Sequence, residues 1–156
     1  MPSLPVPPAV DAFLREPHPA VVATIRPDGS PHSVATWYDW DGELVLLNMD
    51  ASRRRLAFMR RDRRVSLTVL ARDSWYRHVS LLGRIERIAD DEGLADIDRL
   101  ANRYYGRPHS TRDRPRVSAW MRLTSWSVWP EGALRLSNRH SEWPATSESP
   151  ASHRKS

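Results

Sequence analysis

Arginines crowd the start of one predicted helix, and this pattern has the clearest chemical meaning in the chain. The stretch 52–64 holds seven arginines in thirteen residues. Ser52 predicts the N-cap of a helix that runs to about Arg61, so the arginines at 53–55 follow the cap directly. A helix N-terminus carries a positive partial charge and unpaired N–H groups, which makes arginines unfavourable there unless an anion offsets them. The sequence therefore predicts an anion site, and a phosphate suits this geometry best.

The residues alone leave three interpretations of this basic stretch open: a solvated helix face, a nucleic-acid surface, and a site for the phosphate of a cofactor. The formal net charge of +5 is modest for a nucleic-acid-binding protein, and acidic residues are spread along the chain. A predicted strand at 43–49 leads straight into the basic helix start, as in a compact phosphate cradle. Seven tryptophans add flat aromatic surfaces that suit flat ligands.

The sequence shows no recognisable set of catalytic acids, bases and nucleophiles. Phosphate-loop and dinucleotide glycine motifs are missing, and so is a nucleophile elbow. The six histidines have no zinc spacing, and there is no cysteine. His32 and His78 fall on predicted strands and could be site residues, although a partly exposed strand histidine is the simpler interpretation. We therefore assign no catalytic residue and no metal site, and expect a bound cofactor to supply the chemistry.

The hydrophobic pattern predicts a mainly β fold with flanking helices, an α+β protein. Turn signals at 27–30 and 41–42 separate three strands that are expected to form a meander. An acidic cluster at 90–92 predicts the first turn of a long helix. Six strands with two substantial helices indicate an antiparallel barrel with helices packed outside it. The expected helices are 9–16, 52–61 and 90–105, and the expected strands are 20–26, 31–40, 43–49, 65–71, 76–88 and 116–129.

The length of 156 residues suits one domain with a substantial core. We expect this domain at 13–137, after an extended N-terminal arm and the start of the first helix at 1–12. The polar segment 138–156 is expected to be poorly ordered. No apolar run of membrane length and no signal-peptide pattern is present, so we expect a cytoplasmic protein.

An ordered set of motifs resembles the pyridoxamine 5′-phosphate oxidase-like split-barrel superfamily. More closely, the chain is similar to the class B flavin/deazaflavin oxidoreductases, which use coenzyme F420. The resemblance covers roughly residues 13–130 and implies a six-stranded split β-barrel, the FMN-binding split barrel. The matching segments are Pro19–Ile25 with the turn 26–32, Ala35–Leu44, Ser52-Arg53-Arg54 with Leu56, Arg60–Leu67, and Tyr76–Ile85.

The resemblance also implies site residues, and a homodimer with two cofactor sites at its interface. Ser52, Arg53 and Arg54 would contact the cofactor phosphate. The remaining implied positions are Val34, Ala35, Thr36 and Trp37 along the ring, Asn48 and Met49 nearby, and Trp75 or Tyr76 reaching the ring from the partner subunit. Ordinary packing is the simpler interpretation of the two tryptophans.

The function that follows from the resemblance is a hydride transfer between F420 and a small conjugated organic substrate. Arg55, Arg60 and Arg61 could extend the positive field over the polyglutamate tail of the cofactor. Family members often have a lysine where Arg54 stands, and the substrate pattern of true pyridoxamine-phosphate oxidases is missing, which disfavours vitamin B6 oxidation. Two alternatives stay open: an FMN-binding oxidase or flavin reductase of the same fold, and a non-catalytic protein that holds a deazaflavin, a haem-like tetrapyrrole or a nucleic acid.

Overall fold

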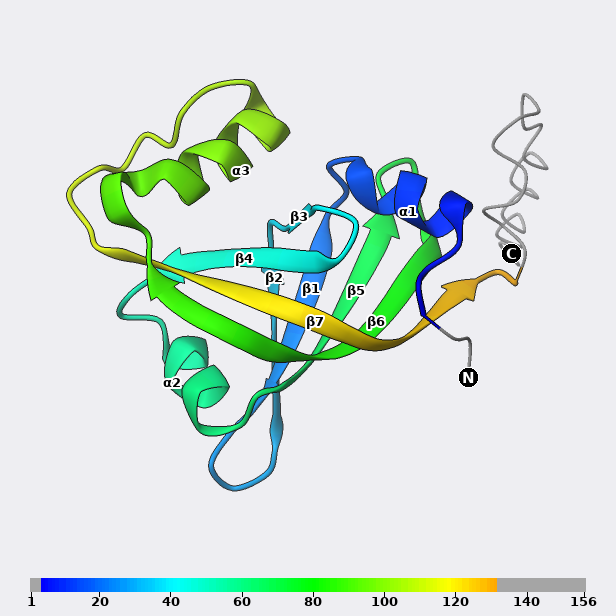
Figure 1. Ribbon diagram of the computed structural model, residues 1–156, viewed down its shortest axis with the longest axis horizontal. Helices are drawn as coiled ribbons and strands as arrows, with labels where there is room; N and C mark the ends of the chain where they lie inside the picture. The colour runs from blue at the N-terminus through cyan, green and yellow to red at the C-terminus, as the bar shows by residue number, and fades with distance from the viewer. Residues whose placement is uncertain (1–3, 132–156) are drawn as a thin grey trace, which may run out of the picture.

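One curved antiparallel sheet of seven strands forms the centre of the computed structural model, which describes residues 4–131 (Figure 1). The strand order is β2-β1-β5-β6-β7-β4-β3, and the two end strands are not paired with each other, so the sheet does not close. The mainly β class with flanking helices is confirmed. The sheet has seven strands instead of six because the predicted strand 31–40 divides in two. The strands are β1 Ala20–Ile25, β2 Pro31–Thr36, β3 Asp39–Trp40, β4 Leu44–Asp50, β5 Arg64–Ala71, β6 Ser74–Asp90 and β7 Arg116–Trp129.

Three α-helices flank this sheet, and each has one apolar face. They are α1 (Pro8–Arg15), α2 (Arg54–Arg61) and α3 (Ala95–Tyr105), with a short 3-10 turn, η1 (Glu92–Leu94), before α3. In Figure 1, α2 and α3 lie at the left of the sheet, below and above the ends of β4, β6 and β7, while α1 lies at the upper right. Of the helices in the described part of the chain, none combines the length and apolarity that a membrane span requires.

The predicted three-stranded meander is wrong, although both of its turns are present. β1 pairs with β2 and β3 pairs with β4, as the turn signals indicate. The two pairs lie at opposite ends of the sheet, because β4 pairs with β7 along its whole length, from Leu44↔Arg122 to Asp50↔Arg116. Trp37 and Tyr38 carry the chain from one pair to the other, and the Tyr38 side chain is fully buried where it crosses.

Both predicted helix starts need correction. Ser52 does not cap α2: its hydroxyl and its N–H both donate to Asp50 Oδ1, at 2.6 and 2.8 Å, and Arg53 takes the N-cap position without a side-chain hydrogen bond. The acidic cluster does not open α3 either, since β6 continues to Asp90 and the helix begins five residues later. Asp91 still caps α3 at a distance, because its carboxylate accepts hydrogen bonds from the backbone N–H groups of Asp96 and Ile97, both at 2.9 Å.

The predicted ends of the other elements lie close to those observed. β7 has the predicted bounds, and Gly106 ends α3 with a φ of 70° and an N–H that donates to the Asn102 carbonyl at 2.8 Å, as expected of a helix C-terminus. The predicted polar tail 138–156 lies outside the described residues. The exposed fraction of Leu56 is 5% and that of Met59 is 0%, so α2 buries one narrow apolar face.

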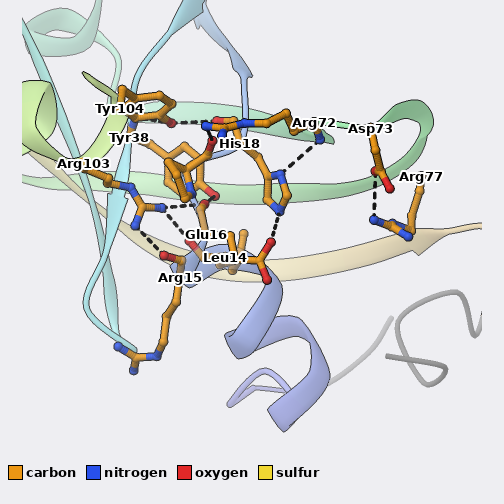
Figure 2. A network of polar contacts seen from close by, with 11 residues as sticks. Leu14, Arg15, Glu16, His18, Tyr38, Arg72, Asp73, Arg77, Arg103 and Tyr104 are labelled. Carbon is orange, nitrogen blue, oxygen red and sulfur yellow. Dashed lines mark hydrogen bonds and ion pairs between the residues drawn. The ribbon is translucent and has the colours of Figure 1, made fainter. Parts of the chain in front are cut away.

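A polar network ties α1 to α3 and to the start of β1 (Figure 2). Arg103 of α3 donates hydrogen bonds to the backbone carbonyls of Leu14, Arg15 and Glu16, at 2.9, 2.6 and 2.7 Å. These carbonyls stand at the end of α1, where no further helical turn can satisfy them, so the guanidinium group replaces the missing donors. The Tyr104 hydroxyl donates to the His18 carbonyl at 2.6 Å. The network therefore fixes the C-terminal half of α3 against the edge of the sheet.

His18 is held in its neutral form within this network. The Arg72 N–H donates to His18 Nδ1 at 3.2 Å, so this nitrogen is an acceptor and the ring proton lies on Nε2, which faces Glu16 Oε2 at 3.3 Å. Burial lowers the pKa of His18, and the positive charges of Arg77 and Arg72 lower it further, against the opposing effect of Glu16 and Asp73.

This arrangement predicts a loss of stability in mild acid. A lowered pKa means that the unfolded chain binds a proton more readily than the folded one, so the free energy of unfolding should fall as the pH drops below about 6.5, the ordinary histidine pKa. The decrease from one proton cannot exceed about 1.4 kcal/mol per pH unit. Urea unfolding between pH 8 and 5.5 measures it. His18→Asn keeps an acceptor for the Arg72 N–H without a titratable ring, and an equally steep decrease in that variant would contradict the assignment.

Candidate functional site

A cavity of about 690 Å³ lies where α3 approaches β1, β2 and β4. Both arginines and aromatic rings line its wall. The cavity therefore offers positive charge and a flat apolar surface to the same ligand. Five of the residues predicted from the sequence line it: Ala35, Thr36, Trp37, Asn48 and Arg53. The other lining residues are Pro17, Pro19, Ala20, Arg55, Arg72, Ile97, Leu100, Tyr104, Tyr105, His109 and Arg116.

Three of the lining arginines form a positive cluster: Arg53, Arg55 and Arg116. Burial lowers the pKa of Arg55, and the charges of Arg53 and Arg116 lower it further. Burial also lowers the pKa of Arg116, with a further decrease from Arg53 that Asp50 and Asp91 oppose. Within residues 4–131 no carboxylate forms an ion pair with any of the three. Asp50 and Asp91 offset the positive charge only at Arg116, so the three arginines still repel one another, and an anion in the cavity would relieve that repulsion.

A buried amide fixes the direction of Arg116. Asn48 Nδ2 donates to Asp91 Oδ2 and to Ser118 Oγ, both at 3.0 Å, so both neighbours on that side are acceptors and the amide oxygen must point the other way. The oxygen accepts the Arg116 Nε–H at 2.7 Å. Asn48 and Asp91 are almost fully buried. The hydrogen bonds therefore run from the N-terminus of α3 through Asp91 and Asn48 to Arg116. Among residues 4–131 only Nε of Arg116 has a hydrogen-bond partner, which leaves its two terminal nitrogens for a ligand.

This network predicts a clear stability effect for Asn48→Leu. The leucine has a similar volume but removes one of the three hydrogen bonds that Asp91 accepts and leaves Arg116 Nε without its partner, so the free energy of unfolding should decrease by about 1–3 kcal/mol. Urea denaturation checks the value. Asn102→Leu is the matched control, because Asn102 is exposed on α3 and should cost less than about 0.5 kcal/mol. Equal losses in the two variants would show that the Asn48 amide contributes nothing specific.

The aromatic part of the wall is built around Trp37. Tyr104 stacks on it, with ring centroids 5.4 Å apart and an interplanar angle of 13°. Tyr105 and His109 meet it edge-on, at 5.2 and 6.3 Å. Tyr104 cannot move easily, because its hydroxyl donates to the His18 carbonyl at 2.6 Å and accepts the Tyr38 N–H at 3.4 Å. This rigid wall extends from the sheet to α3 and can guide a planar ligand.

Six of the predicted site residues do not line the cavity. Met49 has an exposed fraction of only 1% and lies in the hydrophobic core. Val34 is half-buried and packs against the same core. Ser52 is engaged by Asp50, and Arg54 is exposed at the first position of α2. Trp75 and Tyr76, at the start of β6, are exposed by 75% and 43%. Their predicted role concerns the site of a partner subunit, which one chain does not test.

The structure also adds lining residues that the sequence did not indicate. Arg116 joins the cluster because β4 and β7 pair in the register Asp50↔Arg116, a contact between residues far apart in the chain. Tyr104, Tyr105 and His109 reach the cavity because Arg103 docks the end of α3. No local pattern in the sequence shows either contact. Arg55, which was expected to serve a cofactor tail, lines the cavity next to Arg53.

The curved antiparallel sheet with flanking helices places the chain among the split-barrel proteins. The family model described as pyridoxamine 5′-phosphate oxidase matches residues 6–130. The chain therefore belongs to the pyridoxamine 5′-phosphate oxidase family, which confirms the resemblance drawn from its motifs.

Individual relatives point in the same direction. An F420H(2)-dependent biliverdin reductase of Mycobacterium tuberculosis (strain CDC 1551 / Oshkosh) is 33% identical over 94 residues, which are 60% of this chain and 68% of the relative. A solved structure named F420 Reductase is 30% identical, with a TM-score of 0.72, and the match covers 78% of this chain and 98% of that one. An FAD and heme binding protein from Mycobacterium smegmatis, 22% identical with a TM-score of 0.57 and coverages of 76% and 68%, shares the fold. The first two likenesses confirm the predicted enzyme class, an oxidoreductase.

Proposed function

We propose that this protein is an F420-dependent oxidoreductase that transfers a hydride between the deazaflavin and a small conjugated organic substrate. The observation that carries the proposal is the cluster of Arg53, Arg55 and Arg116, which faces a cavity of about 690 Å³ without an acidic partner among the described residues. Such a cluster fits a phosphate, and a phosphate is what anchors a flavin-type cofactor. The relatives whose names specify F420 support this cofactor.

Each part of the cavity has a role in this proposal. The arginine cluster would hold the phosphate, and Ala35 and Thr36 would lie beside the ring, since they line the cavity from the end of β2. Trp37 and Tyr104 would orient a planar substrate and exclude water. The reduced cofactor, when bound, supplies a hydride, so the side chains need to position the reactants and form no covalent intermediate.

We further propose that the protein acts as a homodimer. Trp75, Tyr76 and Trp129 are large apolar side chains with exposed fractions of 75%, 43% and 49%, and they are gathered by edge-on ring contacts at 6.0 and 6.3 Å. A second copy that covers this patch would remove the apolar surface from water and bring Trp75 or Tyr76 toward the site of its partner. Analytical ultracentrifugation of the wild type and of Trp75→Ser tests the dimer.

A fluorescence titration with F420 and, separately, with FMN tests the proposed cofactor. Saturable binding of F420 that is tighter than that of FMN is expected. Tighter binding of FMN would favour the flavin alternative, because its terminal phosphate fits the same arginine cluster. Binding of neither compound at concentrations far above those of ordinary cofactor sites would contradict the proposal. Biliverdin, the substrate in the relative's name, is the first acceptor to test for turnover.

A further inference from the structure

We propose that His109 is the catalytic proton donor of this site. This inference rests on the proposed hydride transfer. A conjugated substrate that accepts a hydride forms one new C–H bond, and the electron pair of its broken π bond moves to an atom further along the conjugated system. That atom must gain a proton so that atoms and charge balance, because substrate, hydride and proton together give the reduced product. Some group at the cavity must therefore deliver a proton to that atom.

The lining residues offer few candidates for this role. Arginine side chains are too basic to release a proton near neutral pH. Burial raises the pKa of Tyr104, and its hydroxyl proton is already donated to the His18 carbonyl. A phenol gives up its proton less readily than an imidazolium, which makes Tyr105 the weaker donor. His109 is the one imidazole among the lining side chains that the structure describes, and an imidazolium is the usual proton donor near neutral pH.

A compact set of contacts holds His109 at the cavity. Asp98 of α3 accepts the His109 backbone N–H at 3.0 Å and binds Arg112 through both carboxylate oxygens, at 2.8 and 3.1 Å. Arg112 in turn donates to the His109 carbonyl at 3.2 Å. The loop after α3 is thereby fastened back onto the helix, and the imidazole stands edge-on to Trp37.

The imidazole also has a defined tautomer. Nδ1 lies 3.0 Å from the Thr111 carbonyl oxygen. A carbonyl can only accept, so Nδ1 carries a proton and donates it there. The second proton of the charged ring is then on Nε2, and it is the one that can leave. Asp98 and Arg112 are the charged groups that bind the His109 backbone, and Trp37 borders the imidazole from the aromatic wall. After transfer, water at the half-exposed ring restores the Nε2 proton.

The test compares wild-type protein with His109→Asn. Asparagine places an N–H donor near the position of Nδ1, so the bond to Thr111 and the loop are kept while the acid is lost. We expect the dissociation constant of reduced F420 to change less than threefold. The single-turnover rate constant for biliverdin reduction should fall by about 10²–10⁴-fold, the usual range for a lost general acid. For the wild type we expect this rate constant to decrease as the solution becomes alkaline, as general-acid catalysis by an imidazolium requires, and we expect the variant to lack that decrease.

A second measurement needs neither cofactor nor turnover. Long-range ¹H–¹⁵N spectra of the cofactor-free protein at high pH should show His109 protonated at Nδ1 and bare at Nε2. The opposite tautomer would overturn the proposal, as would a His109→Asn variant that keeps the rate and its pH dependence. Failure of the wild type to bind either F420 or FMN would instead overturn the proposed function, and this role with it.

Discussion

Replacing Arg55 by alanine is expected to weaken the binding of F420 by about 10- to 150-fold. Arg55 lines the cavity half-buried between Arg53 and Arg116, where burial and the two neighbouring charges lower its pKa. A phosphate in this place would gain a charge-assisted hydrogen bond that water screens poorly, and the loss of such a bond costs about 1.5–3 kcal/mol. Fluorescence titration of the variant measures the change in the dissociation constant.

Arg54→Ala is the matched control for this experiment. It removes the same charge one position earlier in the chain, but Arg54 is exposed and does not line the cavity. Its loss should weaken binding by less than about threefold, as expected of a screened surface charge. A larger effect at Arg54 than at Arg55 would support the phosphate contact that the resemblance implied, and would contradict the site that the cavity defines.

The contrast between Arg54 and Arg55 shows how much of the site could be predicted from the sequence. Charge and position alone predicted an anion site at the basic helix start. The sequence assigned Arg53 and Arg54 to the phosphate and Arg55 to the cofactor tail, whereas Arg53 and Arg55 line the cavity, because the directions of these side chains depend on where the helix begins. Asp50 captures Ser52 through two hydrogen bonds, which moves the helix start to Arg54 and its N-cap to Arg53. A competing local hydrogen bond thus decided which side chains turn inward.

The fold was predictable to a similar extent. Apolar alternation and turn residues located the strands and the β1–β2 and β3–β4 hairpins, which are local features. The place of each hairpin in the sheet depends on pairing between distant segments. The strands β4 and β7 are separated by more than sixty residues, yet their register delivers Arg116 to the cavity beside Asn48. Local periodicity contains no information on such a register.

The aromatic wall depends on a contact between residues that lie even further apart in the sequence, Arg103 and the end of α1. Tyr104 and Tyr105 look in the sequence like the end of an amphipathic helix. Their place beside Trp37 is set by Arg103, which binds the final carbonyls of α1. A helix of this composition could pack in several ways, and a hydrogen-bonded side chain selects one of them. The site residues that the sequence missed are those placed by contacts of this kind.

Gly83→Ala is expected to reduce the free energy of unfolding by about 3 kcal/mol or more. A Cβ atom at Gly83 would lie 2.2 Å from the Arg122 carbonyl oxygen and 2.9 Å from Met121 Cε. The first of these is backbone, so β6 and β7 would have to separate where their register shifts between Leu82 and Gly83. The substitution overpacks the contact between β6 and β7. A movement of the Met121 side chain would not relieve it, because the shortest contact is with the backbone of Arg122. Urea unfolding followed by circular dichroism measures the loss.

Ser80→Ala supplies the comparison on the same strand. It creates the same alanine side chain three residues earlier, where it only removes a hydroxyl, and should change the free energy of unfolding by less than about 1 kcal/mol. A glycine inside a long strand commonly marks a bend or a bulge. The close approach of the Arg122 carbonyl gives a stronger reason, because it requires a residue without Cβ at this one position. Similar losses in the two variants would show that the strands can separate there at little cost, and that the glycine is not needed to bring β7 close to β6.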